Sequence, residues 1–377
     1  MRFFSWSRFV AVLVKEFVQM RRDRLTFAMM VGIPIIQLIL FGFAINSDPK
    51  SLPTAVLAAD NSVFARSFVR ALENSGYFRV VRQVTTEREA ERALAVGEAQ
   101  FVLTIPENFS RKLVRGERPV LLLEADASDP AATSNALAAL LNLNQTALAR
   151  DLSGSLAHLQ NAPPPYEVRV QRRYNPEGVT QYNIVPGLIG VILTMTMVMM
   201  TSLAMTRERE RGTMENLLAT PVRPIEVMTG KIIPYIIVGY VQVTIILAAA
   251  KLLFAVPVVG SVVLLSVVLV LFMAANLAVG FTFSTLAKNQ MQAMQMTFFF
   301  FLPSMLLSGF MFPFRGMPEW AQWLGEILPL THFLRVVRGI LLKGNGMAEI
   351  APELWPIAAF LLVAAIVALI RYRETLD

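Results

Sequence analysis

The stretch RERERGTMENLLATPVRP, residues 207–224, decides how this chain is organised. Five charged residues stand in a row at 207–211 and a sixth follows at Glu215, between two long apolar segments. Such a run cannot enter the hydrocarbon of a bilayer, so it must lie on one side of a membrane. Charge alone fits an ordinary positively charged loop as well as a short amphipathic helix that ends at Pro221.

The composition of the whole chain indicates a membrane protein. Of its 377 residues 55% are hydrophobic and 16% are charged, whereas soluble domains are about 25% charged. The absence of cysteine excludes disulfides, cysteine metal sites and thiol nucleophiles. The net charge is +7, but residues 47–183 hold 15 basic and 15 acidic residues. The excess in the apolar remainder favours anionic lipid over nucleic acid as the partner.

Six apolar segments are long enough to cross a bilayer. They are predicted at 27–45, 184–205, 232–250, 261–286, 294–313 and 354–370. None carries an internal Asp, Glu, His, Lys or Arg, which argues against transport coupled to protons or ions. The first 24 residues combine six basic residues with a helical apolar pattern, which predicts an amphipathic helix in the membrane interface.

Residues 47–183 have a different pattern, in which short apolar runs alternate with charged helical stretches. This alternation predicts an α/β domain. The predicted strands are 54–59, 78–84, 100–105, 120–124 and 166–173, and the predicted helices are 61–74, 86–97, 106–116 and 129–160. The last helix would be about 45 Å long. Glu124, Asp126 and Asp129 cluster near its start, where helix caps are favoured over catalysts.

Two short helices are predicted between the fifth and sixth spans, at 318–327 and 330–342. Trp320 and Trp323 are typical interface anchors, and Arg335 and Arg338 share a face with His332. The pattern favours amphipathic helices on the surface. A re-entrant hairpin, dipping into the membrane from outside, is the alternative.

The distribution of basic residues predicts the orientation. With the N-terminus inside, the short inside segments carry 14 Lys and Arg residues and the short outside segments carry five. The positive-inside rule then puts the charged 207–224 stretch inside and the α/β domain outside.

The sequence contains no P-loop and no kinase, Rossmann or zinc signature. The energy for any transport would therefore come from another subunit, and the charged inside stretch is the natural contact. The spans offer methionine, threonine and phenylalanine, a surface suited to hydrophobic or amphipathic cargo.

Three motifs carry a resemblance to a known family. They are the stretch from Glu208 to Pro221, the stretch from Gly97 through Phe101-Val-Leu-Thr-Ile-Pro to Phe109-Ser, and the stretch from Pro318-x-Trp320 through Pro329-Leu-Thr to Arg338. With the order of spans, they resemble type-2 ABC export permeases (type V exporter fold). More narrowly, the chain looks like the Gram-negative multidrug-efflux permeases that carry a large periplasmic domain.

The resemblance implies a fold, partners and site residues. The fold is an α-helical polytopic membrane protein with six transmembrane helices and an extracytoplasmic α/β domain inserted between helices 1 and 2. The partners are a separate ABC ATPase that binds ATP and Mg, a second permease subunit, identical or related, membrane lipids and a periplasmic adaptor protein. This chain itself would hold no cofactor, metal or catalytic residue. The ATPase-coupling residues would be Glu208, Arg211, Gly212, Thr213, Glu215 and Leu217, and the outer hairpin would include Pro318, Trp320, Pro329 and Arg338.

The expected function is ATP-driven export of drugs or other hydrophobic compounds across the bacterial inner membrane, with both termini cytoplasmic. The expected boundaries are an interfacial helix at 1–24, helix 1 at 25–46, the periplasmic domain at 47–183, helices 2–6 at 184–370, the coupling helix at 207–220, the re-entrant hairpin at 316–343 and a tail at 371–377. The alternative is a membrane-anchored receptor or assembly scaffold whose outer domain binds a ligand or partner. An intramembrane enzyme lacks candidate residues.

Overall fold

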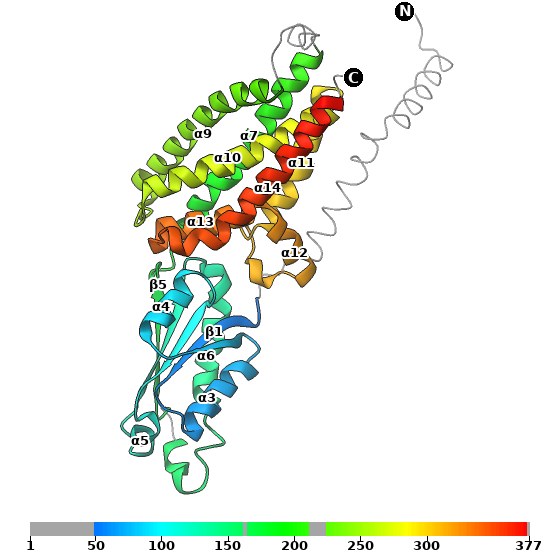
Figure 1. Cartoon of the computed structure of the whole chain (residues 1–377). Coiled ribbons are helices and arrows are strands. Elements are labelled where there is room, and N and C mark those ends of the chain that lie inside the picture. The colour runs from blue at the N-terminus through cyan, green and yellow to red at the C-terminus, as the bar shows by residue number, and fades with distance from the viewer. Residues whose placement is uncertain (1–48, 161–163, 211–223, 375–377) are drawn as a thin grey trace, which may run out of the picture.

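The computed structural model describes residues 49–160, 164–210 and 224–374. The expected interfacial helix 1–24 and the first expected span lie outside these residues. Figure 1 shows an α/β domain at one end of the molecule and a bundle of long helices at the other, with short helices at the level where the two meet.

The α/β domain contains a five-stranded mixed sheet in the order β2-β1-β3-β4-β5. Its strands are β1 (Leu52–Ala58), β2 (Phe78–Val84), β3 (Phe101–Ile105), β4 (Val120–Asp126) and β5 (Glu167–Arg173). Only the β3–β4 pair is antiparallel. The five strands fall where the alternating apolar pattern predicts them, because alternate side chains point to opposite faces of a sheet.

Helices cover both faces of this sheet. They are α3 (Val63–Asn74), α4 (Glu87–Ala95), α5 (Phe109–Val114) and α6 (Pro130–Thr146). Phe101 and Leu103 of β3 face a core shared with α3, α5 and α6, whereas Val102 between them faces a smaller core against α4. The domain therefore has its own buried interior, independent of the helix bundle.

The prediction of one long helix at 129–160 is wrong. α6 ends at Thr146, turns follow, and a short helix, η2, occupies Gly154–Gln160. The hydroxyl of Tyr166 donates to the Asn144 carbonyl at 2.7 Å, the oxygen that a continuing helix would offer to the amide of Leu148. Leu148 lies beyond the end of α6 but is still buried. The regular spacing of the leucines therefore indicates which side chains are buried, and it does not show that the helix continues.

The bundle is built from α7 (Thr180–Glu210), α9 (Pro224–Phe254), α10 (Val262–Leu286), α11 (Gln290–Leu307) and α14 (Met347–Glu374). Among the described residues, four helices are long and apolar enough to cross a membrane: Thr180–Arg207, Pro234–Phe254, Val262–Leu286 and Met347–Arg371. These match the second, third, fourth and sixth expected spans.

Two expected spans differ from the helices found. α11 has 18 residues and begins with three glutamines in six, which makes it too polar to join the four candidates. α14 begins at Met347, well before the span expected from 354, and so includes Glu353. The expected span was bounded by its uncharged residues, but a helix can begin with charged turns before it enters an apolar environment. The start of α14 is therefore earlier than the apolar pattern predicts.

Two short helices and a π-helical turn join α11 to α14. They are α12 (Glu319–Ile327), α13 (Pro329–Arg338) and η4 (Gly339–Lys343), preceded by the single turn η3 (Phe314–Gly316). We call α12, α13 and η4 together the hairpin. α13 is buried among α7, α10 and α14, and Phe333 stacks on Phe272 of α10 with ring centroids 4.1 Å apart. A Cβ at Gly190 of α7 would come within 2.8 Å of Leu330, so glycine is needed for this close packing.

Candidate functional site

The expected coupling segment begins at the end of α7 that lies away from the α/β domain (Figure 1). Glu208 belongs to the last turns of that helix. The remaining coupling residues, Arg211, Gly212, Thr213, Glu215 and Leu217, lie outside the described residues, so their roles stay predictions.

The end of α7 contacts the start of α11. The backbone amide of Gln290 donates to Glu210 at 2.8 Å, and its side chain donates to the same carboxylate. These hydrogen bonds lower the pKa of Glu210, since the side chain and then the backbone of Gln290 stabilise the ionised form. The last residue of α7 and the first residue of α11 therefore meet at the end of the bundle that the sequence places inside.

The four expected hairpin residues occupy different environments. Pro318 is the N-cap residue of α12 and Pro329 is the first residue of α13, where proline is well tolerated. Trp320 is 41% exposed on α12. Arg338 ends α13 and donates from both terminal nitrogens to the Gly309 carbonyl, at 3.3 and 3.4 Å. The structure thus buries Pro329 and leaves Trp320 on the surface.

The α/β domain docks on the hairpin through the end of α4. Three donors from the bundle side reach backbone carbonyls there: Lys343 to Leu94 at 3.0 Å, Asn345 to Ala95 at 2.9 Å and Arg315 to Gly97 at 3.1 Å. The last carbonyls of a helix lack intrahelical partners and carry partial negative charge, so cations are favoured beside them. Lys343 of the hairpin, with Arg315 before it and Asn345 after it, therefore binds the carbonyl end of α4.

Lys343 also makes a buried ion pair across this junction. Its ammonium lies 2.5 Å from the Asp126 carboxylate, and the two side chains are only 8% and 9% exposed. Asp126 ends β4, and the backbone amide of Ser128 donates to it at 3.1 Å. Both charges are thus removed from water and neutralise each other, so separating the two units would leave each without its partner.

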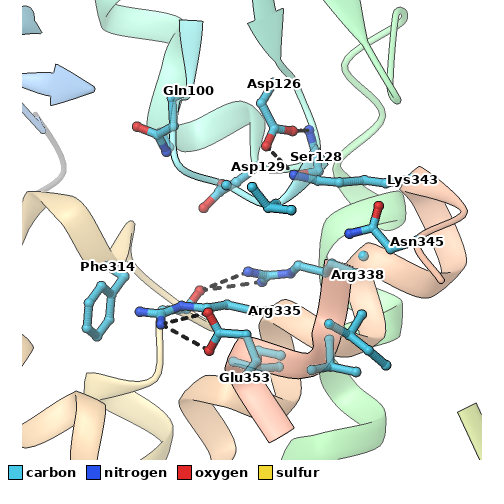
Figure 2. A pocket seen from close by; sticks show the side chains of 18 of the residues that line it. Gln100, Asp126, Ser128, Asp129, Phe314, Arg335, Arg338, Lys343, Asn345 and Glu353 are labelled. Carbon is cyan, nitrogen blue, oxygen red and sulfur yellow. Dashed lines mark hydrogen bonds and ion pairs between the residues drawn. The ribbon is translucent and has the colours of Figure 1, made fainter. Parts of the chain in front are cut away.

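A cavity of about 270 Å³ lies beside this ion pair. Figure 2 shows its two walls, with Gln100, Asp126 and Asp129 on the side of the α/β domain and Arg335, Arg338 and Glu353 on the side of the bundle. The lining is rich in both signs of charge. It fits a hinge or contact layer between two units better than a pocket for an apolar molecule.

The expectation that Glu124, Asp126 and Asp129 cap the following helix is not met. Asp129 occupies the N-cap position of α6 without a side-chain capping bond, and it accepts from Asn183 of α7 at 2.8 Å. Burial raises the pKa of Asp129, and the charge of Arg338 opposes that effect. Glu124 binds Arg173 at 2.6 Å. Asp126 and Asp129 therefore contact residues of the bundle side, Lys343 and Asn183, and Glu124 contacts the last residue of β5.

No local sequence pattern marks Lys343, Glu353 and Glu326 as functional candidates. Lys343 and Asp126 stand 217 residues apart, so no local spacing joins them. Glu353 precedes the expected sixth span and carries no motif. A usable signal was available for His332 and Arg335, because ionisable residues that recur every three positions share one face of a helix, and a charge on a buried helix needs a partner.

Within the described ranges, no group of three or more His, Cys, Asp or Glu residues is placed to hold a metal ion. The charged and polar groups at the junction pair with one another across the two units.

Comparisons with known proteins agree with the architecture. The sequence model described as ABC-2 family transporter protein matches residues 24–370. YbhS of Escherichia coli K12, named a probable multidrug ABC transporter permease, is 29% identical over 347 residues, which cover 90% of each chain. YbhR of the same strain, with the same description, is 28% identical over 369 residues, covering 98% of this chain and 99% of YbhR. YhhJ of E. coli K12, named an inner membrane transport permease, is 27% identical over 361 residues, covering 91% and 93%.

Proposed function

This chain belongs to the ABC-2 family of transporter proteins, and from that premise we propose that it is the permease of an exporter driven by a separate ATPase. The family match covers nearly the whole length, and the relatives are named permeases. The chain is therefore a transporter component rather than a catalyst. The export direction, the ATPase and the cargo are parts of the proposal.

The observation that carries the proposal is the difference between the two ends of the bundle. One end carries the α/β domain, and the other carries the charged end of α7, held to α11 through Glu210 and Gln290 (Figure 1). An ATPase in the cytoplasm needs a contact surface on one side only. We assign the charged end to the cytoplasm and the α/β domain to the periplasm, as the positive-inside rule favours.

The coupling residues are Glu208, Arg211, Gly212, Thr213, Glu215 and Leu217. A second permease subunit, identical or related, completes the proposed complex, and the ATPase holds the ATP and Mg. The protein lies in the bacterial inner membrane with both termini in the cytoplasm. The outer domain is the part that a periplasmic adaptor protein can reach.

The cargo is a drug or another hydrophobic or amphipathic compound. Support comes from the names of YbhS and YbhR and from the interior of the bundle, where Met197, Met273 and Phe272 are buried beside partly buried methionines. Methionine adapts its shape easily, which suits varied ligands. The buried position of α13 supports a re-entrant hairpin at the outer end over two helices that lie on the surface.

The test is copurification of the full-length chain with its ATPase. Glu215→Lys and Arg211→Glu reverse charges in the coupling segment, so we expect loss of the bound ATPase and of permease-stimulated ATP hydrolysis, with normal membrane insertion. Glu107→Lys is the matched control, because it makes the same reversal at an exposed position of the α/β domain. Normal ATPase recovery with both coupling variants would contradict the proposal. Recovery of the chain without any ATPase would favour the receptor or scaffold function instead.

A further inference from the structure

The cavity between the α/β domain and the hairpin is lined by paired and unpaired charges. Lys343 and Arg335 make the ion pairs there, with Asp126 and with two glutamates. Arg338 of the hairpin and Asp129 of the α/β domain also line the cavity, and neither makes an ion pair with any residue that the structure describes. A bound molecule can therefore pair with both of these charges.

Arg338 has hydrogen-bond donors left over on the bundle side of the cavity. Its two terminal nitrogens donate to a single acceptor, the Gly309 carbonyl, at 3.3 and 3.4 Å. Its Nε is shielded from solvent and has no acceptor within the described part of the chain. A guanidinium keeps its charge in proteins, and its planar fork of donors matches the oxygens of a phosphate or carboxylate. This wall therefore suits the anionic end of a ligand.

Asp129 is held in place on the facing wall (Figure 2). The side-chain amide of Asn183 donates to it at 2.8 Å, and Asn183 itself is only 8% exposed. The charge of Arg338 acts on Asp129 across the cavity, although the two lie beyond ion-pair distance. Gln100 lines the same wall, and its side-chain oxygen has no donor among the described residues. A carboxylate and an amide oxygen together suit an ammonium group, which has N–H donors and no acceptor.

The position of the cavity is that of a lipid head group. Glu353, in the first turns of α14, lines it, and the apolar part of that helix is long enough to cross a membrane. Trp323 on α12 and Trp355 on α14 are 76% and 69% exposed, as expected of residues that anchor a protein at the head groups. Arg315 and Glu326 of the lining are exposed, so the cavity has an entrance. Its volume of about 270 Å³ lies below the range of drug-sized sites.

We propose that this cavity binds a phosphoethanolamine group, with its phosphate at Arg338 and its ammonium at Asp129 and Gln100. The group carries one anion and one ammonium on a two-carbon linker, which matches one cation and one anion on facing walls. A glycerol phosphate head group has no ammonium, so it leaves Asp129 without a cation. A choline head group has no N–H, so it leaves the oxygen of Gln100 without a donor.

The group has two sources, the head group of phosphatidylethanolamine and soluble phosphoethanolamine. Bound in either form, it contacts the α/β domain and the hairpin at once, and so adds to the docking that Lys343 provides. The proposal rests on this junction alone and involves neither the ATPase nor the cargo. Water fills many polar cavities, so the test compares ligands that differ only in the head group.

The test is native mass spectrometry of the full-length protein, stripped of lipid in detergent. Phosphatidylethanolamine, phosphatidylglycerol and phosphatidylcholine with identical acyl chains are added separately, and soluble phosphoethanolamine is added in a fourth series. We expect phosphatidylethanolamine to bind at least about tenfold more tightly than the other two lipids, because one hydrogen bond between charged groups contributes about that factor. Soluble phosphoethanolamine that binds as tightly as the lipid would identify a soluble ligand, and binding of the lipid alone would identify the head group. Equal binding of the three lipids without binding of the soluble compound would overturn the proposal.

Two substitutions separate the two ends of the ligand. Asp129→Asn removes the charge that holds the ammonium, so the preference for phosphatidylethanolamine over phosphatidylglycerol should disappear while both lipids still bind. Arg338→Gln removes the contact with the phosphate, so binding of phosphatidylethanolamine should weaken by about tenfold or more. Arg111→Gln is the matched control, because it makes the same change at an exposed position of α5 and should leave every affinity unchanged. An Asp129→Asn protein with the wild-type preference would contradict the proposal.

A second measurement locates the bound group. Hydrogen exchange of the full-length protein, with and without phosphatidylethanolamine, should show increased protection on both walls of the cavity, at residues 95–100 and 308–309. Protection in β2, which lies at the other edge of the sheet from β5, should not change. Lipid binding without added protection at either wall would place the lipid on the outer surface of the bundle and would overturn the proposal. That result would leave the proposed function standing, since the measurement contains no ATPase and no cargo.

Discussion

Two buried aspartates at opposite ends of the same sheet have different partners. Asp60 follows β1 and Asp126 ends β4, and they are 9% and 8% exposed. β1 runs parallel to β3 whereas β4 runs antiparallel to it. The C-terminal ends of β1 and β4, and with them the two carboxylates, therefore lie at opposite ends of the sheet along the strand direction. Asp60 is satisfied by neutral donors of its own domain, the Ser62 amide and the amide and hydroxyl of Ser110. Asp126 takes a cation from the bundle.

The difference shows which end of the domain contacts the helix bundle: the end that carries Asp126. A carboxylate satisfied by local amides holds α3 and α5 together whatever the bundle does. A carboxylate that depends on Lys343 is satisfied only while the two units are docked. The two carboxylates are equally buried, but the contacts of Asp60 depend only on the fold of the domain, whereas the ion pair of Asp126 depends on where the domain sits against the bundle.

The largest effect is expected from Lys343→Ala. The substitution leaves Asp126 buried without its cation, and breaking such a pair costs about 3–5 kcal/mol. We expect the α/β domain to undock while its own core survives. Hydrogen exchange of the full-length protein should then show lost protection around Leu94–Gly97 and unchanged protection in β3. The double variant Lys343→Met with Asp126→Leu should recover most of the docking, because a matched apolar pair replaces the charges. Failure to recover would mean that the hydrogen bond from Lys343 to the Leu94 carbonyl contributes more to docking than the ion pair.

Asp60→Asn should have a smaller effect, with a different pH dependence. Burial alone would raise the pKa of Asp60, but hydrogen bonds from Ser110 and Ser62 prevail and lower it. The stabilisation is therefore complete above the unfolded pKa and is lost as the pH falls through the lower folded value. We expect a loss of about 1.5–3 kcal/mol near neutral pH, typical of a hydrogen-bonded charge. Thermal unfolding of the α/β domain within the whole protein, followed from about pH 7 to about pH 3, should show the two proteins converging.

Arg82→Ala is expected to reduce stability least, and it gives a reference for the stability losses of Lys343→Ala and Asp60→Asn. Arg82 and Glu98 form an ion pair at 3.2 Å, but their side chains are 55% and 58% exposed. Exposed pairs of this kind contribute about 0.2–1 kcal/mol and are screened by salt. A loss as large as that of Lys343→Ala would show that charge, rather than burial, governs both variants.

The sequence predicts the sheet and most of the long helices because each depends on a local pattern. Strands β2 and β3 and the start of α4 at Thr86 follow from alternation and from a capping residue whose hydroxyl accepts the Glu89 amide. The predicted helix at 129–160 is too long. Leu148 keeps the helical spacing of leucines, but the Tyr166 hydroxyl takes the Asn144 carbonyl that the next helical hydrogen bond would need. Tyr166 lies just before β5, 22 residues beyond Asn144, so no local pattern contains this contact.

The candidate site is less predictable than the fold. Pro329 and Arg338 mark the hairpin in the sequence, yet the residues that dock it on the domain are Lys343 and Asn345, whose acceptors lie about 250 residues earlier. Such contacts arise from tertiary packing, which sequence spacing does not encode. The expected ATPase contact around Glu215 stays a prediction, since it lies outside the described residues.

The short connection from β5 to α7 couples the position of the α/β domain to the tilt of α7. Buried Asn175 bonds the carbonyl and the amide of Val179, both at 2.9 Å, and so stiffens the link between sheet and helix. α7 has 31 residues, which makes it about 46 Å long. A tilt of about 5° at its charged end would therefore displace the other end by about 4 Å. That displacement is comparable to the length of a hydrogen bond, so a small rotation at one surface is enough to exchange bonding partners at the other.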